Sequence, residues 1–239
     1  MSGPGALAEL IDAAHGDGRL LDAGSAPALD LDTAYVVQGL LTDRRTARGA
    51  RRIGWKLGYT SAAMRAQMGV DRPNLGPLLD SHLVTEGRLP SGLVQPRVEP
   101  EIAVEVGPDG RPGRVRAALE IVDSVWRGYR FTLELNTADG SSAAGVVLGP
   151  ELPVEALDGL PVDLERNGRP VGSSTGAAAM GHPFTAFAWL ADELDRRGER
   201  LRAGELILTG GLTAAVPLNP GDTVGARFGT ECLVEVRRP

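Results

Sequence analysis

The sequence has little of several residue types whose abundance would point to a particular function. Among its 239 residues there is one cysteine, Cys232, so neither a disulfide framework nor a cysteine-based zinc site is expected. Aromatic residues make up 4% of the chain, which argues against a base-stacking surface. The net charge is −6 and the basic residues are interleaved with acidic ones, so a nucleic-acid partner is disfavoured.

Long apolar runs are also missing. No stretch approaches the roughly 20 apolar residues that a membrane span needs, and the first residues lack the basic segment and apolar run of a secretory leader. We therefore expect no membrane partner and a cytoplasmic location. Apolar residues still make up 42% of the chain, which is enough for a globular protein with a sizeable core.

The chain changes character along its length. Helical periodicity predicts helices over 6–14, 32–48 and 61–68, and later from Pro183 to Arg197, before Gly198. Alternating or short apolar runs predict strands over 53–59, 206–208, 223–228 and 233–236, and Asn167-Gly168 predicts a hairpin turn. We expect an α+β fold, in which a helical N-terminal region (1–50) and a β-rich catalytic domain (51–239) form one structural unit.

Three glutamates form the most informative pattern. Glu99 and Glu101 are two residues apart, so on a strand their side chains leave the same face. Glu120 lies in an apolar run, where a lone carboxylate is costly unless it is paired or bound to a metal. Three convergent carboxylates suit a hard divalent cation. Spacing alone also fits a solvated strand face for Glu99 and Glu101, and an exposed side of an amphipathic segment for Glu120.

Other candidates are weaker on their own. Lys56 stands in Gly54-Trp-Lys-Leu-Gly58, where flanking glycines allow the backbone to approach a ligand, although an exposed strand lysine fits as well. The three histidines make no ligand-spaced pair. The sequence has no nucleophile elbow, no P-loop and no dinucleotide-binding fingerprint.

Taken together and in order, these segments resemble the 2-keto-4-pentenoate hydratase / 4-oxalocrotonate decarboxylase family, a branch of the fumarylacetoacetate hydrolase-like superfamily. The likeness runs from about Tyr35 to the C-terminus. The segments that carry it are GWKLGYT (54–60), GVDRP (69–73), QPRVEPEIA (95–103), LEIVDS (119–124), MGHP (180–183), AWLA (188–191) and LILTGG (206–211).

The resemblance implies a mixed β-roll or barrel-like core, a homo-oligomer, and one Mg²⁺ or Mn²⁺ held by Glu99, Glu101 and Glu120. It implies a small 2-hydroxy-dienoate substrate or its 2-oxo tautomer. Lys56 matches the active-site lysine, with a pKa that we expect the cation and burial to lower. Ser142 would orient water or substrate. The substrate-binding positions would be Leu57, Thr209 and Gly210.

The sequence departs from the family pattern at three positions. Asn74 replaces an aspartate that is a proposed base, so we expect Asp80 or a metal-bound water to serve instead. Val125 replaces an arginine, which mildly favours a substrate with one carboxylate over a diacid. Gly140 replaces an asparagine. The connection between Glu101 and Glu120 is also shorter than usual, as if a helix were trimmed.

The predicted function is a metal-dependent lyase that hydrates a 2-hydroxy-2,4-dienoate to a 4-hydroxy-2-oxo acid. Decarboxylation of an oxalocrotonate-like diacid is the main alternative, because loss of CO₂ also needs an enolate to accept the electron pair. C–C bond hydrolysis, and a specialised-pathway relative with an altered substrate, are further alternatives. A non-catalytic subunit that pairs with a pathway enzyme is the alternative from a different class.

Overall fold

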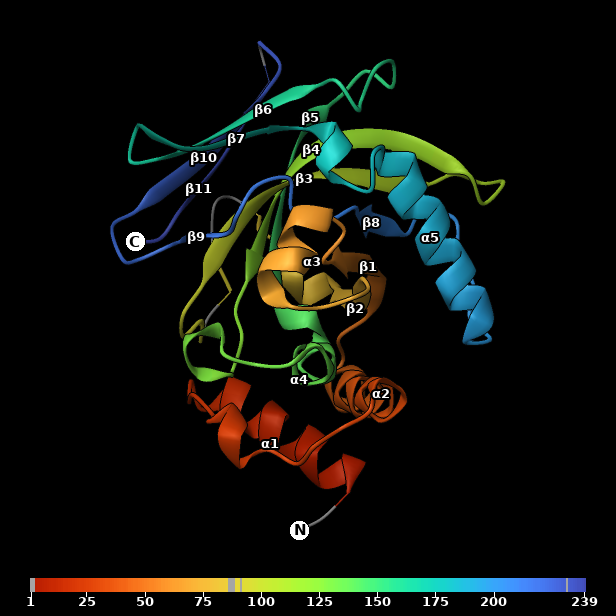
Figure 1. Ribbon diagram of the computed structural model, residues 1–239, viewed down its shortest axis with the longest axis vertical. Helices are drawn as coiled ribbons and strands as arrows, with labels where there is room; N and C mark the ends of the chain where they lie inside the picture. Colours follow the sequence, from red (N-terminus) through yellow and green to blue (C-terminus); the bar gives the residue numbers. More distant parts are fainter. Residues whose placement is uncertain (1–2, 86–88, 91, 231) are drawn as a thin grey trace.

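Two β-sheets form the body of the protein, with helices at one end and along one side (Figure 1). The computed structural model describes residues 3–85, 89–90, 92–230 and 232–239. Within these residues, one sheet has the strand order β2-β1-β8-β3-β4-β5, with β9 paired to β3, and the other has the order β11-β10-β6-β7. The predicted α+β class is confirmed, and the core consists of two open sheets, not a closed barrel.

The larger sheet is built around a long antiparallel hairpin, β3 and β4, which turns tightly where Gly107 N–H donates to Arg111 O (2.7 Å). Alternation along β3 sends Val98 and Ile102 into the main core, so its glutamates leave the opposite face. The strands are β1 (Arg52–Gly58), β2 (Asn74–Leu79), β3 (Arg97–Val106), β4 (Pro112–Val122), β5 (Ala143–Glu151), β8 (Leu206–Leu208) and β9 (Val216–Pro217).

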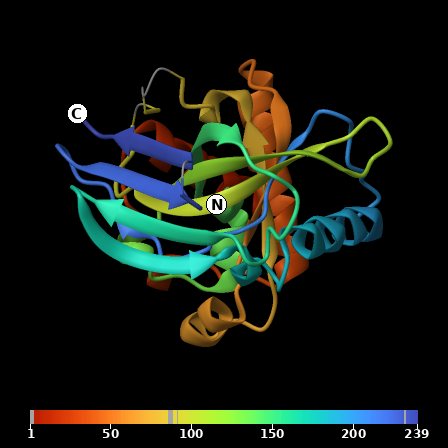
Figure 2. The same ribbon diagram turned by 90° about the horizontal axis from the view of Figure 1, so that it is seen from above.

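The smaller sheet covers the apolar face of the larger one, and residues of both sheets share one hydrophobic core. Figure 2 shows this second layer from above. Asn167 and Gly168 both have positive φ (54° and 71°), as a type I′ turn requires, so the predicted hairpin is confirmed. Its strands are β6 (Pro161–Arg166), β7 (Arg169–Thr175), β10 (Thr223–Phe228) and β11 (Cys232–Arg237).

Three helices form a separate apolar cluster at one end of the molecule (Figure 1). They are α1 (Pro4–Gly16), α2 (Leu31–Ala47) and α4 (Leu133–Ala138). Asp30 caps α2 by accepting a hydrogen bond from Thr33 N–H (2.7 Å). Val125 and Trp126 are buried among these helices, and the short helix α4 was not predicted.

Helix α5 (Pro183–Arg196) lies along the side of the sheets, and α3 (Ala62–Met68) follows β1. As predicted, Pro183 occupies the first turn of α5 and the apolar face of this helix packs into the main core. His182 caps the helix by accepting a hydrogen bond at Nδ1 from Phe184 N–H (3.0 Å), which was not predicted. The helices of the described residues are each too short or too polar to cross a membrane. Short 3-10 turns are η1 (Ala23–Ser25), η2 (Asp80–His82), η3 (Arg127–Tyr129), η4 (Gly140–Ser142) and η5 (Gly176–Ala178).

Candidate active site

The three glutamates converge on one face of the β3–β4 hairpin. Glu99 and Glu101 follow the alternation of β3, and Glu120 on β4 is paired directly with Glu99. One carboxylate oxygen from each residue lies within 4.8 Å of the other two. The side chains of Glu101 and Glu120 are fully buried, and Glu99 is half-buried. The structure therefore does not support the alternative of a solvated strand face.

This cluster has the chemistry of a site for a hard divalent cation. Glu101 Oε2 accepts a hydrogen bond from Gly210 N–H (2.7 Å), but in the described structure no N–H or O–H group donates to the other oxygen, Oε1, or to Glu120 Oε1. Burial and the charge of Glu120 raise the pKa of Glu99 to about 7 and that of Glu101 well above its ordinary value. A dication would supply the charge that these buried carboxylates lack.

Lys56 reaches this cluster from β1. Its Nζ lies 3.1 Å from Glu120 Oε2 and donates to Ser141 O (3.0 Å), and the residue is 3% exposed. Burial alone would lower the pKa of Lys56, but the charges of Glu120, Glu99 and Glu101 outweigh burial and raise it. We expected a bound cation and burial to lower this pKa; among the protein groups alone, the carboxylates outweigh burial and the direction is the reverse.

Glycines allow the backbone to approach the carboxylates closely. A Cβ at position 211 would lie 2.6 Å from Glu99 Oε2, so a side chain there would displace the Glu99 carboxylate from its present position. Gly210 has φ 104° and points its N–H at Glu101. Thr209, by contrast, is fully buried and donates its hydroxyl to Ile102 O (2.9 Å). Of these two predicted substrate-binding residues, Gly210 therefore contacts the cluster, and Thr209 holds the end of β8 against β3.

A cavity of about 280 Å³ opens beside the glutamates. Ser142 lines it together with Lys56 and Glu99. The side chain of Leu57 points to the other face of β1, where it is buried in the main core, so it does not line the cavity as predicted. The cavity is also lined by residues for which no individual role was predicted: Tyr59, Arg97, Tyr129, Asn136 and Ser141.

The segment 140–142 presents its groups to the cavity in a strained conformation. All three residues have positive φ (68°, 55° and 58°), which is costly for the two serines. Ser142 Oγ accepts a hydrogen bond from Asn136 Nδ2 (2.9 Å), and Ser141 Oγ donates to Asn74 Oδ1 (3.0 Å). Asn74, which is fully buried, therefore serves as a hydrogen-bonding partner of this segment.

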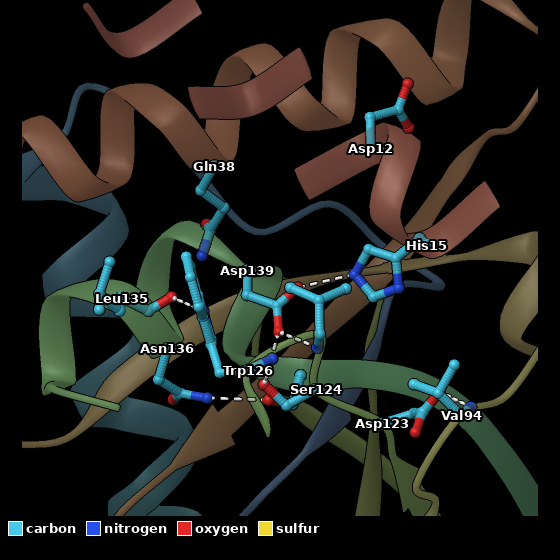
Figure 3. A network of polar contacts seen from close by, with 12 residues as sticks. Asp12, His15, Gln38, Val94, Asp123, Ser124, Trp126, Leu135, Asn136 and Asp139 are labelled. Atoms are coloured by element: carbon cyan, nitrogen blue, oxygen red, sulfur yellow. Dashed lines mark hydrogen bonds and ion pairs between the residues drawn. The ribbon is translucent and has the colours of Figure 1, made fainter. Parts of the chain in front are cut away.

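A second polar network holds this segment from behind (Figure 3). Asp139 Oδ1 lies 2.7 Å from His15 Nε2 of helix α1, and Asp139 Oδ2 accepts hydrogen bonds from Ser124 Oγ (2.9 Å) and Val125 N–H (3.2 Å). Asp139 immediately precedes the strained residues. The N-terminal helices are thereby tied to the cavity wall.

Two expectations need correction. Asp80 does not line the cavity: it lies on η2, where its carboxylate accepts hydrogen bonds from Arg51 N–H and Nε (both 3.0 Å), and these bonds lower its pKa. Such a carboxylate is a poor base, so the structure does not support a catalytic role for Asp80. Val125 packs among the N-terminal helices, so its identity carries no information about the number of carboxylates on a substrate.

A buried acidic cluster, a lysine and an adjoining cavity on a β-rich scaffold are the features expected of a metal-dependent enzyme. Residues 79–237 match the family model of the fumarylacetoacetate (FAA) hydrolase C-terminal domain, and the chain belongs to this family. The sequence is 38% identical to the 4-oxalocrotonate decarboxylase of Pseudomonas sp. (strain CF600), over 88% of this chain and 86% of that protein. It is 36% identical to the 2-keto-4-pentenoate hydratase of Paraburkholderia xenovorans (strain LB400), over 82% and 79%.

A solved structure agrees with these matches. The 4-oxalocrotonate decarboxylase from Pseudomonas putida G7, complexed with magnesium and adipate, superposes with a TM-score of 0.91 at 34% identity, covering 99% of this chain and 97% of that one. The same decarboxylase has also been solved with calcium and acetate. The resemblance inferred from the sequence is confirmed, and the relatives include both the predicted activity and its main alternative.

Proposed function

We propose that the protein is a divalent-metal-dependent lyase that acts on a small 2-oxo acid or its 2-hydroxy-dienoate tautomer through an enolate. The observation that carries this proposal is the cluster of Glu99, Glu101 and Glu120 beside Lys56 at the wall of one cavity. The names of the relatives support the same chemistry, which covers both hydration of a 2-hydroxy-2,4-dienoate and decarboxylation of an oxalocrotonate-like diacid.

In this proposal the three glutamates hold Mg²⁺ or Mn²⁺, since carboxylate oxygens suit both ions. When bound, the cation would stabilise the negative charge that develops on the substrate's 2-oxygen during either reaction. Gly210 N–H fixes the orientation of the Glu101 carboxylate, and the backbone at Gly211 leaves room for Glu99.

Lys56 is the proposed proton-transfer and carboxylate-binding group. Its ammonium is held by Glu120 and Ser141 O, so it presents positive charge to an anionic substrate without a large change of geometry. Ser142, fixed by Asn136, would orient water or substrate with its hydroxyl. Met64, Met68 and Phe131 form an apolar part of the wall and limit the access of water.

We also propose a homo-oligomer and a cytoplasmic location, as the family resemblance suggests. The boundary at residue 50 between an N-terminal helical region and a catalytic domain stays a prediction, and so does binding to another enzyme of the same pathway. A non-catalytic subunit is disfavoured by the fully buried Glu101 and Glu120, because a scaffold gains nothing from burying like charges together.

The test is an absorbance assay with Mg²⁺. The purified protein is mixed separately with 2-hydroxypenta-2,4-dienoate and with 4-oxalocrotonate, and the ultraviolet signal of each conjugated acid is followed with and without chelator. A metal-dependent loss of signal with either substrate supports the lyase, and product analysis separates hydration from release of CO₂. If the absorbance of neither substrate changes when the protein is added with Mg²⁺ or Mn²⁺, the proposed lyase function is rejected.

A further inference from the structure

A second cavity, of about 640 Å³, lies where helices α1 and α2 meet η2 and the start of β5. Among the residues that the structure describes, none lines both this cavity and the one beside the glutamates. Its volume is in the range of cavities that hold small molecules. Aspartates, two arginines and two histidines contribute to its lining, and the proposed lyase chemistry uses none of them.

The carboxylates of this second cavity are already bound within the protein. Asp12 accepts hydrogen bonds from Arg48 Nη1 and Nη2 (both 2.7 Å). Asp80 is held by Arg51, as described above. Asp123 accepts hydrogen bonds from two backbone N–H groups (2.8 and 2.7 Å). These carboxylates therefore have little need of a bound cation, and one of the two arginines is paired as well.

The other arginine, Arg45 of helix α2, has no such partner. In the part of the chain that the structure describes, no oxygen accepts a hydrogen bond from its guanidinium, although Arg44 and Arg48 both pair with Asp12. Burial lowers the pKa of Arg45, and the nearby charges of Asp139 and Asp12 only partly offset burial. A half-buried positive charge without a paired carboxylate favours an anion in the cavity that it lines.

His82 offers a second donor to the same cavity. The residue is 7% exposed, and its Nδ1 accepts a hydrogen bond from Leu79 N–H (3.4 Å). Burial and the charge of Arg45 lower the pKa of His82 to about 3, so at neutral pH the ring is uncharged and carries its proton on Nε2. Within the described residues nothing accepts this N–H, and the side chain lines the cavity. The Nε2–H group can therefore donate to a ligand.

We propose that this cavity is a second ligand site, which binds a small oxyanion, a phosphate or a carboxylate, between the Arg45 guanidinium and the His82 Nε2–H group. A guanidinium offers two parallel N–H groups to either oxyanion, and the imidazole supplies a third donor. The inference goes beyond the lyase function and does not depend on it, because neither residue lines the cavity beside the glutamates.

The position of the site shows what a bound anion would do. Arg45 belongs to the helical end of the molecule, whereas His82 lies on η2, directly after β2 of the larger sheet. His15 of α1, which also lines this cavity, already ties the helices to Asp139 (Figure 3). An anion held by both Arg45 and His82 adds a second tie between the helices and the sheet, and it should stabilise the folded protein.

The experiment is calorimetry of the purified protein with inorganic phosphate and, separately, with acetate, in the presence of chelator and at constant ionic strength. At least one anion should bind with a dissociation constant of about 1 mM or lower, the scale of two or three charge-assisted hydrogen bonds. Binding of phosphate alone identifies a phosphate site, and binding of acetate alone identifies a carboxylate site.

Variants locate the anion. Arg45→Met should weaken binding by about tenfold or more, and His82→Phe by about threefold or more. Arg45→Lys, which keeps the charge but not the planar fork, should weaken it less than Arg45→Met. Arg44→Met on α2 and Arg111→Met on the exposed β3–β4 turn are the matched controls, since each removes a positive charge outside the cavity and should leave the affinity unchanged.

Thermal unfolding gives a second readout. At about a hundred times its dissociation constant, the anion should raise the Tm of the unmodified protein and of Arg44→Met by roughly 5 °C, and that of Arg45→Met much less. A general salt effect would be equal in all three proteins.

Three results would overturn the proposal. They are no binding of either anion up to about 20 mM, an affinity that Arg45→Met leaves unchanged, and loss of binding in Lys56→Met, which would place the anion in the cavity beside the glutamates. None of these results depends on turnover, so the outcome is separate from that of the lyase assay.

Discussion

Lys56 Nζ and Glu120 Oε2 lie 3.1 Å apart although their strands, β1 and β4, are separated in the sheet by β8 and β3. Both side chains are almost completely buried, at 4% and 0% exposure. The long lysine side chain covers part of this distance. On the same face of the sheet, Leu208 of β8 lies next to Lys56, and the small side chains of Ala103 on β3 and Ala118 on β4 lie toward the glutamates.

Replacing Lys56 by Met should abolish turnover, with a fall in kcat of at least about a hundredfold, the usual contribution of a group that moves a proton. The variant keeps the length and burial of the side chain but removes the charge that faces Glu120. Steady-state assays with both candidate substrates measure the effect, and Arg111→Met serves as the control. Activity within a few-fold of the unmodified enzyme would show that Lys56 is only structural.

Glu101→Gln should have opposite effects on metal binding and on stability. Loss of one charged ligand should weaken Mn²⁺ binding by about a hundredfold or more, measured by calorimetry. In the presence of chelator the same change should raise the urea midpoint, because burial and the charge of Glu120 disfavour a charged Glu101 in the folded state and raise its pKa.

Glu105→Gln is the matched control for Glu101→Gln. It lies on the same strand but pairs with Arg114, outside the cluster, and should change neither property. Unchanged Mn²⁺ affinity in Glu101→Gln would contradict the assignment of the metal ligands.

The helices, strands and turns could be predicted from the sequence better than the residues that surround the glutamate cluster. Periodicity located helices α1, α2 and α5, and the Asn167-Gly168 pair located a turn, because those signals are local. Strand alternation predicted that Glu99 and Glu101 share a face. Their burial beside Glu120 depended on the pairing of β3 with β4, for which the sequence offered only the family resemblance.

The residues around the metal cluster could not be placed from sequence because they come from distant segments. Asp80 and Val125 were interpreted by comparison with a family pattern, and the structure puts both away from the cavity. Arg97 is part of the segment QPRVEPEIA, but no role was predicted for it. Its guanidinium stacks on Tyr129, which lies in a distant turn of the chain, and this contact cannot be read from the sequence. Its position beside two glutamates was the one available signal.

His82 should make the protein less stable as the pH falls from neutrality. Burial, followed by the charges of Arg45 and His15, lowers the pKa of His82 to about 3 from 6.5. Between pH 6.5 and about pH 3, His82 binds a proton in the unfolded chain but not in the folded chain. Its contribution to the free energy of unfolding is therefore complete above pH 6.5 and is lost progressively as the pH falls toward 3. From pH 7 to pH 5 the loss from this residue is about 2 kcal/mol.

Urea unfolding of the unmodified protein and of His82→Gln at both pH values tests this expectation. Each protein carries the same carboxylates, so the difference between their pH dependences isolates His82. The variant should lose less stability than the unmodified protein on going from pH 7 to pH 5. Equal losses would show that His82 takes up its proton in the folded state.

Asp139→Asn should damage the active site from outside the cavity. Asp139 accepts hydrogen bonds from Ser124 Oγ and Val125 N–H on one oxygen and faces His15 on the other. In the asparagine variant, an NH₂ group replaces one of the two carboxylate oxygens, so at least one of these buried hydrogen bonds is lost. The free energy of unfolding should fall by about 1–3 kcal/mol. His15→Ala should cost less, because the His15 side chain is 22% exposed and Asp139 is fully buried.

Asp139 adjoins the strained residues that present Ser141 O to Lys56 and Ser142 to the cavity, so the same substitution should also lower kcat. The fall in kcat should persist at temperatures where Asp139→Asn is fully folded, and His15→Ala should lower kcat less. If Asp139→Asn were destabilised but turned over substrate at the normal rate when folded, the network of Figure 3 would hold the N-terminal helices in place without positioning the active-site segment.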